Sequence, residues 1–454
     1  MNLPNYFFAD LPPEAELTPA MLAESCRVLK RNRAAHLAPR STASLVNLLG
    51  ELGENWRHAE FPFRKFALAQ GPAATGFSRA TLERGLDSFF RVLTAENLET
   101  LIVQDLGHAQ RLDKFMASLA EETAGRAALA RGPELLAHIA AGNIPNPTLT
   151  SIVLGMLTRS AQFVKCARGA SFLPRLFAHS IYDADKKIGG CLEIAEWRGG
   201  DAALESILFA EADCVTATGG DEALADIRAR LPGTTRFLGY GHQLSFAAIT
   251  SDAFAGGRLR ATVANAAMDV VAWDQQGCLS PHVIYVETGG NVPPEKFAEL
   301  LAAELAAREA SEPRGNISVE EAAAIASRRG IYEVRAAHSP ETTRHWFSEG
   351  STAWTVVFEA EPRFQTSCLN RFIYVKGVKD LAEVLQAADE VRGKVSTVGV
   401  AATETKAREL ALQLARWGAS RVCPLGQMQN PPLTWRHDGR PMLGDLVTWT
   451  DFEQ

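Results

Sequence analysis

Residues 138–170 read HIAAGNIPNPTLTSIVLGMLTRSAQFVKCARGA, and this stretch decides the fold. Its pattern predicts a strand over His138–Gly142, a helix over Thr148–Arg159 and a second strand over Gln162–Lys165. The alternation continues with a helix at 172–182, a strand at 192–197, a helix at 202–210, a strand at 214–217 and a helix at 222–231. Strands that alternate with helices predict a parallel sheet with right-handed crossovers. Ligands of such sheets bind at the carboxyl ends of the strands.

The sequence predicts a helical region before this stretch and a second α/β region after it. Apolar residues recur at helical spacing in Leu22–Leu29, Leu45–Leu52 and Leu82–Leu93, which indicates packing rather than chemistry. The strand–helix alternation resumes near residue 250, with helices at 258–267, 294–310, 381–391 and 406–416 and strands at 283–287, 355–359 and 371–375. The tail from residue 431 onward reads as a loop with aromatic anchors at Trp435 and Trp449.

Length and composition indicate a globular protein of two or three domains. The chain has 454 residues, of which 46% are hydrophobic and 22% are charged, and its net charge is −7. Since no basic stripe stands out, a nucleic-acid partner is not expected. No apolar run approaches the roughly 18 residues that a membrane-spanning helix needs. The N-terminus shows neither the basic nor the apolar region of a signal peptide, so secretion is not expected.

The cysteines point to a reducing compartment, and we expect a cytoplasmic protein. Seven cysteines lie at positions 26, 166, 191, 214, 278, 368 and 423. Their number is odd and no two form a Cys-x-x-Cys pair, which argues against a disulfide framework and against a structural zinc site. No metal is therefore expected. Most cysteines in such a setting are small buried hydrophobes, so a catalytic one needs additional support.

The stretch WDQQGCLSPH, residues 273–282, holds the candidate nucleophile Cys278. The pattern places this cysteine on a loop that runs straight into the strand predicted at 283–287. Reactive groups concentrate on loops that a rigid scaffold positions. Gly277 allows a ligand to approach closely, and the polar neighbours favour a thiolate. The alternative is a buried cysteine that serves only packing.

Asn143, Lys165 and Arg168 follow the ends of two consecutive predicted strands. Asn143 stands in AGNIPNP, where its side-chain amide is a candidate donor to an oxyanion; the alternative is an ordinary turn residue. Lys165 and Arg168 place two cations at the carboxyl end of the strand at 162–165. Such cations suit a phosphate-bearing cofactor, whereas the alternative is a pair of solvated surface charges.

Thr218, Gly219 and Gly220 follow the strand predicted at 214–217 and precede a helix. Glycines at this point let backbone N–H groups reach a pyrophosphate at the helix N-terminus. The alternative is a plain helix start that is capped by Asp221. No Gly-x-Gly-x-x-Gly motif occurs, and Gly239-Tyr-Gly241 is only half of one.

His242 and His282 are the histidines nearest to these motifs. The ordinary interpretation of each is a structural histidine with satisfied hydrogen bonds. Pairing of a histidine with Cys278 matters only if the fold brings the two side chains together.

The order of these motifs resembles the aldehyde dehydrogenase superfamily. In that superfamily a strand followed by Asn, a strand ending in Lys, a Thr-Gly turn and a Gly-Cys turn occur in sequence, and the separation of 135 residues between Asn143 and Cys278 (278 − 143) also fits. The residues within these motifs resemble still more closely those of the acyl-CoA reductase family typified by LuxC of bacterial luminescence. This likeness rests on the stretches at 138–147, 238–246 and 274–281 and on the closing 435–439 and 446–449. It spans nearly the whole chain and is weakest before residue 130.

The resemblance assigns roles residue by residue. Cys278 takes the position of the nucleophile, and Asn143 takes that of the oxyanion donor. Lys165 takes the position of the lysine that contacts the adenosine ribose. Thr218 and Gly219 take that of the Thr-Gly pair that approaches the nicotinamide and the pyrophosphate, and Gly220 completes this turn.

Two departures from the superfamily pattern are informative. Members that prefer NAD usually carry Glu three residues after the lysine, but this chain has Arg168, which can bind a 2′-phosphate and so favours NADPH. Hydrolytic members carry a general-base Glu in a Glu-Leu-Gly-Gly segment. The corresponding segment here, Phe237–His242, has no carboxylate. A reductase that takes acyl groups from a thioester needs no such base.

The resemblance implies an α/β, aldehyde dehydrogenase-like fold with a Rossmann-type cofactor domain and a second α/β catalytic domain. We expect the helical N-terminal region and the cofactor domain over 1–249, the catalytic domain over 250–425, and a C-terminal segment, 426–454, that returns to the cofactor domain. A homo-oligomer is also expected.

The implied reaction is reduction of a fatty acyl thioester, with acyl-CoA as the expected substrate, to the aldehyde. NADPH is the expected cofactor, an acyl-Cys278 intermediate is expected, and His242 is the candidate for protonation. An acyl carrier or an acyl-transfer enzyme is a candidate partner. Two alternatives stay open: an NADP-dependent oxidising (semi)aldehyde dehydrogenase, and a catalytically silent scaffold for an acyl-transfer partner.

Overall fold

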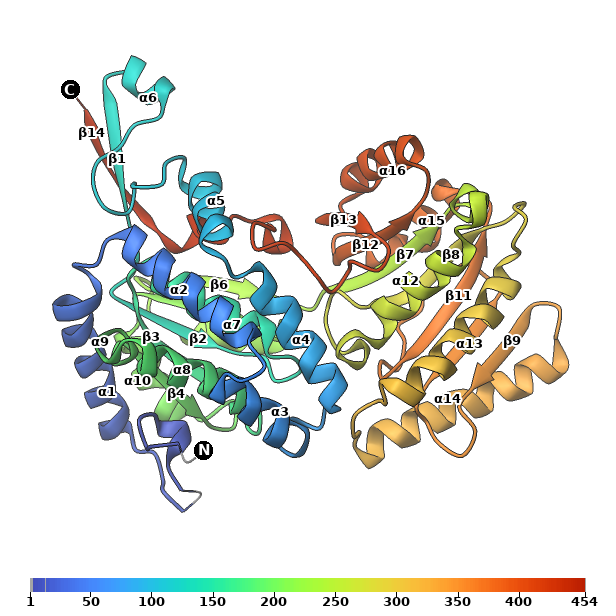
Figure 1. Ribbon diagram of the computed structural model, residues 1–454, viewed down its shortest axis with the longest axis horizontal. Coiled ribbons are helices and arrows are strands. Elements are labelled where there is room, and N and C mark those ends of the chain that lie inside the picture. Colours follow the sequence, from blue (N-terminus) through green and yellow to red (C-terminus); the bar gives the residue numbers. More distant parts are fainter. Residues whose placement is uncertain (1–2, 13, 454) are drawn as a thin grey trace. The chain divides into compact units, whose positions relative to one another are not determined.

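The strand–helix alternation around residues 135–240 builds a five-stranded parallel sheet. The computed structural model describes residues 3–12 and 14–453 (Figure 1). The strands are β2 (Leu135–Ile139), β3 (Ala161–Cys166), β4 (Leu192–Glu196), β5 (Cys214–Thr218) and β6 (Arg236–Tyr240), in the order β4-β3-β2-β5-β6. Every neighbouring pair is parallel, which confirms the predicted sheet.

The first and last of these strands differ from the prediction. β2 ends at Ile139 rather than at Gly142, because the buried residues that pair with β3 begin at Leu135 and the chain leaves the sheet after Ile139. β6 was not predicted as a strand. Its residues are all only partly buried and include Gly239, so the segment lacks the apolar run by which a central strand is recognised.

Helices cover both faces of this sheet. α1 (Pro19–Asn32) and α10 (Ala202–Glu211) contribute Leu22, Leu208 and other residues to a core that includes Phe163 of β3. On the opposite face, the Gln162 amide donates to the carbonyl of Ile152 in α7 (Asn146–Leu157). Successive strand residues point to opposite faces, so adjacent β3 residues serve different layers. The other helices are α2 (Thr42–Arg57), α3 (Pro62–Thr75), α4 (Arg79–Val92), α5 (Ala95–Leu106), α6 (Leu119–Thr123), α8 (Phe172–Ala184), α9 (Lys186–Gly189) and α11 (Asp221–Arg230).

The C-terminal tail is only partly a loop. β14 (Thr448–Glu453) pairs antiparallel with β1 (Arg126–Arg131) in a two-stranded ribbon (Figure 1). Trp449 is 44% exposed and is therefore not the anchor that the sequence predicted. Trp435 does pack, with its ring centroid 4.8 Å from that of His437. The strand escaped prediction because β14 buries almost nothing, so no hydrophobic pattern marks it.

A seven-stranded sheet forms the second layered structure. Its strands are β7 (Leu244–Ile249), β8 (Pro281–Glu287), β9 (Thr343–Phe347), β10 (Thr355–Glu359), β11 (Phe372–Val378), β12 (Val395–Ala401) and β13 (Arg421–Pro424), in the order β13-β12-β7-β8-β11-β10-β9. Only β9, at one edge, runs antiparallel to its neighbour. One core joins the sheet to α12 (Leu259–Val271) and α13 (Pro294–Ser311), and the other joins it to α14 (Val319–His338), α15 (Leu381–Ala387) and α16 (Glu404–Trp417).

The chain divides into two compact units. Unit 1 comprises the residues up to Thr75, Leu86–Gly241 and the residues from Pro432 onward; unit 2 comprises Gly76–Gly85 and His242–Pro431. We had expected the division at residue 249. β7 instead belongs with unit 2, because it pairs with β8 and β12 of the seven-stranded sheet. Among the helices of residues 3–12 and 14–453, none combines the length and the apolarity that crossing a membrane requires.

Candidate active site

Cys278 lies in a tight turn that leads directly into β8. This segment, Gln276–Ser280, is called the Cys278 turn below. The N–H of Ser280 donates to the carbonyl of Gly277 at 2.9 Å, and the Ser245 hydroxyl of β7 donates to the Cys278 carbonyl at 2.8 Å. Cys278 and Cys368 are partly exposed, whereas the other five cysteines are buried. The loop position matches the sequence prediction, but it lies at the amino end of β8 rather than at a carboxyl end.

Two three-residue segments with left-handed backbone precede the strands β8 and β11. Trp273–Gln275 has φ values of 50°, 50° and 65°, and Leu369–Arg371 has values of 58°, 55° and 65°. Left-handed conformation costs an L-residue roughly 1–2 kcal/mol. Such strain persists only where surrounding contacts impose it, and it clusters at functional sites.

A buried ion pair joins these two segments. The Arg371 guanidinium donates through Nε to Asp274 Oδ1 at 2.9 Å, and the two side chains are only 2% and 3% exposed. The Gln275 amide nitrogen donates to the carbonyls of Pro281 at 2.7 Å and Phe372 at 2.9 Å. Since Gln275 and Pro281 flank the Cys278 turn, this amide holds the two ends of the turn together.

His282 lies at the start of β8, four residues after the nucleophile candidate. Its Nδ1 accepts from the Ser367 backbone N–H at 3.1 Å, so the ring proton of the neutral form is on Nε2. Burial, and secondarily the charge of His242, lowers the pKa of His282 to about 4. His282 is therefore neutral near pH 7. His242 itself is exposed and lies just before β7.

Lys165 lies in β3, one residue before the strand ends. It is only 4% exposed, so the alternative of a solvated surface charge is wrong. Its ammonium lies 5.8 Å from the centroid of the Trp197 ring, and burial lowers the pKa of the lysine. A cation held in this way at the edge of a parallel sheet is suited to contact a polar ligand.

Arg168 is exposed in the loop after β3. In the same loop, the Gly169 N–H donates to Glu196 Oε1 at 2.6 Å. Glu196 ends the neighbouring strand β4, and exposed Arg198 follows two residues later. The loop thus carries charges of both signs. Sequence reasoning missed Glu196 and Arg198, although their position at the end of a strand adjacent to Lys165 is a signal that could have found them.

Asn143 is exposed in the loop between β2 and α7, four residues beyond Ile139, so it does not follow directly on the strand as the sequence predicts. The loop packs against the loop that follows β3. A Cβ added to Gly142 would lie 3.1 Å from the Cβ of Ala167. The structure therefore brings the Asn143 loop and the loop after Lys165 together at one edge of the unit 1 sheet.

The turn after β5 contains Thr218 as the last strand residue and Gly220 as the N-cap of α11. Asp221 is the first helical residue, so the alternative in which it caps the helix is wrong. The N–H of Gly219 donates to the carbonyl of Tyr240 at 3.2 Å. A Cβ added to Gly220 would meet nothing within 4 Å. The helix N-terminus is therefore open, which suits an anion.

The C-terminal segment covers the strand β6, where the hydrolytic members would carry their glutamate. Tyr240 stacks on His437 with ring centroids 4.6 Å apart, and Arg440 lies 4.4 Å from the Tyr240 ring centroid. Burial raises the pKa of Tyr240 to about 12, so this phenol stays protonated. Neither the sequence nor these contacts supply a carboxylate from Phe237–His242.

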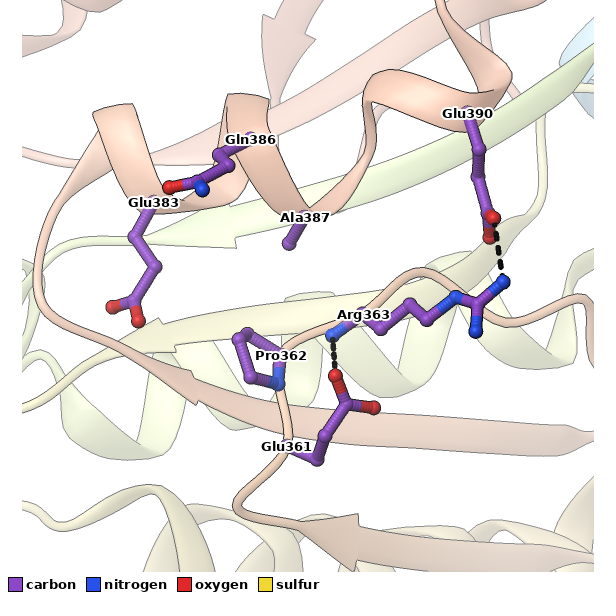
Figure 2. A pocket seen from close by; sticks show the side chains of 7 residues that line it. All are labelled: Glu361, Pro362, Arg363, Glu383, Gln386, Ala387 and Glu390. Atoms are coloured by element: carbon purple, nitrogen blue, oxygen red, sulfur yellow. Dashed lines mark hydrogen bonds and ion pairs between the residues drawn. The ribbon is translucent and has the colours of Figure 1, made fainter.

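A cavity of about 410 Å³ in unit 2 is separate from the Cys278 turn. Figure 2 shows Arg363 between two of its carboxylates: its N–H donates to Glu361 and its guanidinium donates to Glu390, each at 3.0 Å. These residues lie beyond the carboxyl end of β10 and beside α15. Because β8, β11 and β10 run parallel, the cavity and the Cys278 turn lie at opposite edges of the sheet. We therefore do not include it in the candidate active site.

Comparison with known proteins identifies the family. The acyl-CoA reductase (LuxC) family matches residues 37–449 of the chain. A curated relative, the long-chain acyl-protein thioester reductase of Aliivibrio fischeri, is 25% identical over 420 residues, which cover 90% of this chain and 82% of the relative.

Solved structures share the fold at low identity. A NAD-dependent benzaldehyde dehydrogenase from Corynebacterium glutamicum superposes with a TM-score of 0.70 at 13% identity, covering 97% of this chain and 91% of that one. A glyceraldehyde-3-phosphate dehydrogenase from Methanocaldococcus jannaschii, complexed with NADP, superposes with a TM-score of 0.64 at 12% identity. The match covers 96% of this chain and 95% of that one. The bifunctional proline utilization A protein superposes with a TM-score of 0.70 at 16% identity. The match covers 98% of this chain and 45% of that protein, so this chain spans about half the length of that protein. The fold is that of the aldehyde dehydrogenases, and the chain belongs to the acyl-CoA reductase (LuxC) family.

Proposed function

We propose that this protein reduces a fatty acyl thioester to the aldehyde, with NADPH as reductant and Cys278 as nucleophile. The observation that carries the proposal is the Cys278 turn, which presents a partly exposed cysteine on a frame of buried hydrogen bonds. Family membership and the name of the A. fischeri relative support an acyl thioester as substrate class. Acyl-CoA is the substrate that we propose, and an acyl carrier or an acyl-transfer enzyme is the alternative donor.

The residues at the edge of the unit 1 sheet fit a dinucleotide. Lys165 offers a buried cation, and the open backbone at Gly220 exposes the N-terminus of α11. Lys165 would contact the adenosine ribose, and Thr218 and Gly219 would approach the nicotinamide and pyrophosphate, as in the superfamily. When bound, NADPH supplies the hydride that reduces the acyl group.

The preference for NADPH rests on Arg168. An exposed guanidinium beside the β3–β4 edge can bind a 2′-phosphate bidentately, and Arg198 adds a second positive charge at the end of β4. Glu196 opposes this preference, because its carboxylate would repel the 2′-phosphate of NADPH. The same carboxylate could instead accept a hydrogen bond from a ribose hydroxyl of NADH. One of its oxygens is occupied by the Gly169 N–H, which restricts it. We therefore propose NADPH, with NADH as the competing cofactor.

The first chemical step transfers the acyl group to the protein. The Cys278 thiolate attacks the thioester carbonyl carbon, a new C–S bond forms and negative charge moves to the oxygen. The Asn143 amide donates a hydrogen bond to this oxygen. When the carbonyl reforms, the old C–S bond breaks and the carrier leaves as a thiolate that takes a proton. The acyl group is then bonded to Cys278.

The second step releases the aldehyde. After reduction, the substrate carbon carries hydrogen, oxygen and the Cys278 sulfur. The carbonyl reforms, the C–S bond breaks, and Cys278 regains its thiolate. We assign proton handling to His242, which is exposed and close enough to His282 to affect its pKa. Neutral His282 contributes no charge to the site near pH 7.

The missing carboxylate favours this reaction over oxidation of an aldehyde to an acid. Oxidation would require a base to activate water, and Phe237–His242 contains no carboxylate. A scaffold without catalysis is the other alternative. Titration with NADPH separates it from an enzyme, since a silent scaffold need not bind the cofactor.

We also propose a cytoplasmic homo-oligomer that associates through the β1–β14 ribbon. Within residues 3–12 and 14–453, the β14 side of this ribbon pairs with no further strand, whereas Met116 and Arg111 bond the β1 side. The side chains of Phe115, Trp449 and Phe452 are 41–47% exposed on or beside the ribbon. Unpaired strand edges and apolar side chains favour association with another chain. Light scattering after size exclusion tests this: a particle of 49.2 kDa, the mass of one chain, would contradict it.

Mass spectrometry with a panel of acyl-CoAs tests the central proposal. Without NADPH, an acyl adduct should form on Cys278 and identify the preferred chain length. Cys368→Ala is the matched control, because Cys368 is the other partly exposed cysteine and its loss should leave the adduct unchanged. Adduct formation on Cys368 alone would contradict the proposal.

A further inference from the structure

We infer that Gln429 is a positioning residue that sets the place of the Cys278 turn through contact with Gly277. The inference rests on the proposed role of Cys278 as nucleophile. Gln429 lies in the segment after β13, about 150 positions from the turn in sequence, and it is only 6% exposed. None of the sequence patterns singles it out.

The first contact is between the Gln429 amide and the α-carbon of Gly277. A Cβ added to Gly277 would lie 2.5 Å from Gln429 Nε2 and 2.9 Å from its Oε1, distances that real Cβ atoms do not tolerate. The backbone of Gly277 is not left-handed. A larger residue here would therefore force the Gln429 amide to move, and the reason is the space that the amide occupies, not the backbone conformation.

The second contact is a hydrogen bond at the other end of the turn. Gln429 Nε2 donates to the hydroxyl of Ser280, and Ser280 is 1% exposed. The N–H of Ser280 in turn donates to the carbonyl of Gly277 at 2.9 Å. The one amide thus touches both residues that close the turn, with Cys278 between them.

The segment that carries Gln429 is held by hydrogen bonds to α12. The buried carboxylate of Asp269, 1% exposed, accepts from the N–H groups of Gly426 and Met428, the latter at 3.0 Å. The Arg421 guanidinium donates to the carbonyl of Met428 at 2.6 Å. These bonds fix the backbone beside Gln429. Its amide is buried and bonded to Ser280, so it acts as a stop with little room to move.

A rigid stop matters because nucleophilic attack is sensitive to position. A displacement of about 1 Å can cost on the order of 10²-fold in rate. Gln429 contacts Gly277 and Ser280, not the reacting atoms, so its effect passes through the turn. Its loss should lower the rate of acylation while leaving cofactor affinity unchanged.

The test is a double-mutant cycle with Gly277→Ala and Gln429→Ala. The first readout is the rate at which iodoacetamide alkylates Cys278, measured by peptide mass spectrometry with Cys368 in the same sample as reference. The second is the single-turnover rate of acylation by an acyl-CoA. Gly277→Ala should change the Cys278 alkylation rate and slow acylation at least tenfold. The double variant should return to the rates of Gln429→Ala alone, since the obstacle to the new methyl group has been removed.

Two further variants separate the contributions of the amide. Gln429→Met fills the space but donates no hydrogen bond, so it should retain the effect of Gly277→Ala and lose part of the acylation rate. Gln427→Ala is the matched control in the same segment, because the Gln427 side chain is exposed. It should change neither readout.

Independent effects of the two substitutions in the cycle would overturn the inference, as would normal acylation by Gln429→Ala. Thermal unfolding of each variant identifies simple loss of folding, which would expose Cys278 and Cys368 to iodoacetamide and raise both alkylation rates together. Failure of the proposed function looks different. In that case the cycle would still show coupling in the alkylation rates, but the wild type would show no acylation of Cys278.

Discussion

The edge of the unit 1 sheet and the Cys278 turn of unit 2 differ in how firmly their residues are held. The unit 1 edge is made of glycine-containing loops with exposed Asn143 and Arg168, around one buried cation, Lys165. The Cys278 turn is flanked by left-handed segments that a buried ion pair and the Gln275 amide hold in place. A cofactor must enter and leave at every turnover, whereas a nucleophile needs one fixed position. The difference predicts what substitutions do: apart from Asn143, changes in the open loops should alter cofactor affinity, and changes in the Cys278 turn should alter the reaction rate.

Cys278→Ala should have the largest effect, because it removes the atom that we propose carries the acyl group. Reduction of acyl-CoA, followed as NADPH oxidation, should fall to background. NADPH binding, followed by fluorescence titration, should remain, since the residues that we propose for the cofactor belong to unit 1. Substantial residual reduction by this variant would show that the fixed turn is not the reactive region.

The absence of a carboxylate in Phe237–His242 should leave the acylated protein long-lived without cofactor. General-base assistance accelerates such steps by about 10²–10⁴-fold, so hydrolysis should be slower by that order than with such a base, and slow compared with reduction. Quenched samples analysed by intact mass should retain the adduct until NADPH is added, and then release aldehyde. Prompt release of free fatty acid without NADPH would favour the oxidising dehydrogenase.

Asn143→Ala should slow acylation by about 10²–10³-fold, the usual cost of losing one oxyanion donor. Its side chain is exposed in a loop, so the variant should fold normally. Stopped-flow acylation combined with a thermal melt distinguishes the two roles. Asn146→Ala, in the first turn of the following helix, is a matched control that should acylate at the normal rate. If Asn143→Ala instead melts early at an unchanged rate, this loop has only a structural role.

Arg168→Glu should have the smallest effect, and it should alter cofactor choice alone. Loss of one bidentate phosphate contact and gain of a repulsive charge should shrink the NADPH preference by about tenfold or more. The ratio of kcat/KM for NADPH and NADH measures this, and cofactor-free acylation of Cys278 should not change. Arg198→Glu tests the neighbouring cation in the same way. Equal use of both cofactors by the wild type would contradict our assignment of Arg168.

Sequence reasoning recovered the parallel sheet and the family, because buried strands such as β3 and β10 carry continuous apolar runs with clear ends. It missed β6 and β14, where burial is partial and no such pattern exists. It also missed the buried strands β7 and β12, whose apolar runs are interrupted by Ser245, and by Ser396, Thr397 and Gly399. At the candidate site, motif order pointed to Cys278 and Lys165. It could not find Gln429, because a long-range packing contact leaves no local trace in the sequence.

The segment Gly76–Gly85 has a consequence for how the protein is made. The indole of Trp273 occupies the position that a side chain at Gly85 would need, since a Cβ there would lie 2.0 Å from the ring. The Phe77 ring meets the same indole edge-on, with the two ring centroids 5.1 Å apart. These partners emerge from the ribosome 188 positions before Trp273 (273 − 85), on the order of 10–40 s earlier at roughly 5–20 residues per second. Unit 2 therefore cannot complete its own packing during early synthesis, and a gene fragment that encodes only residues 242–431 would leave Trp273 uncovered beside the Cys278 turn.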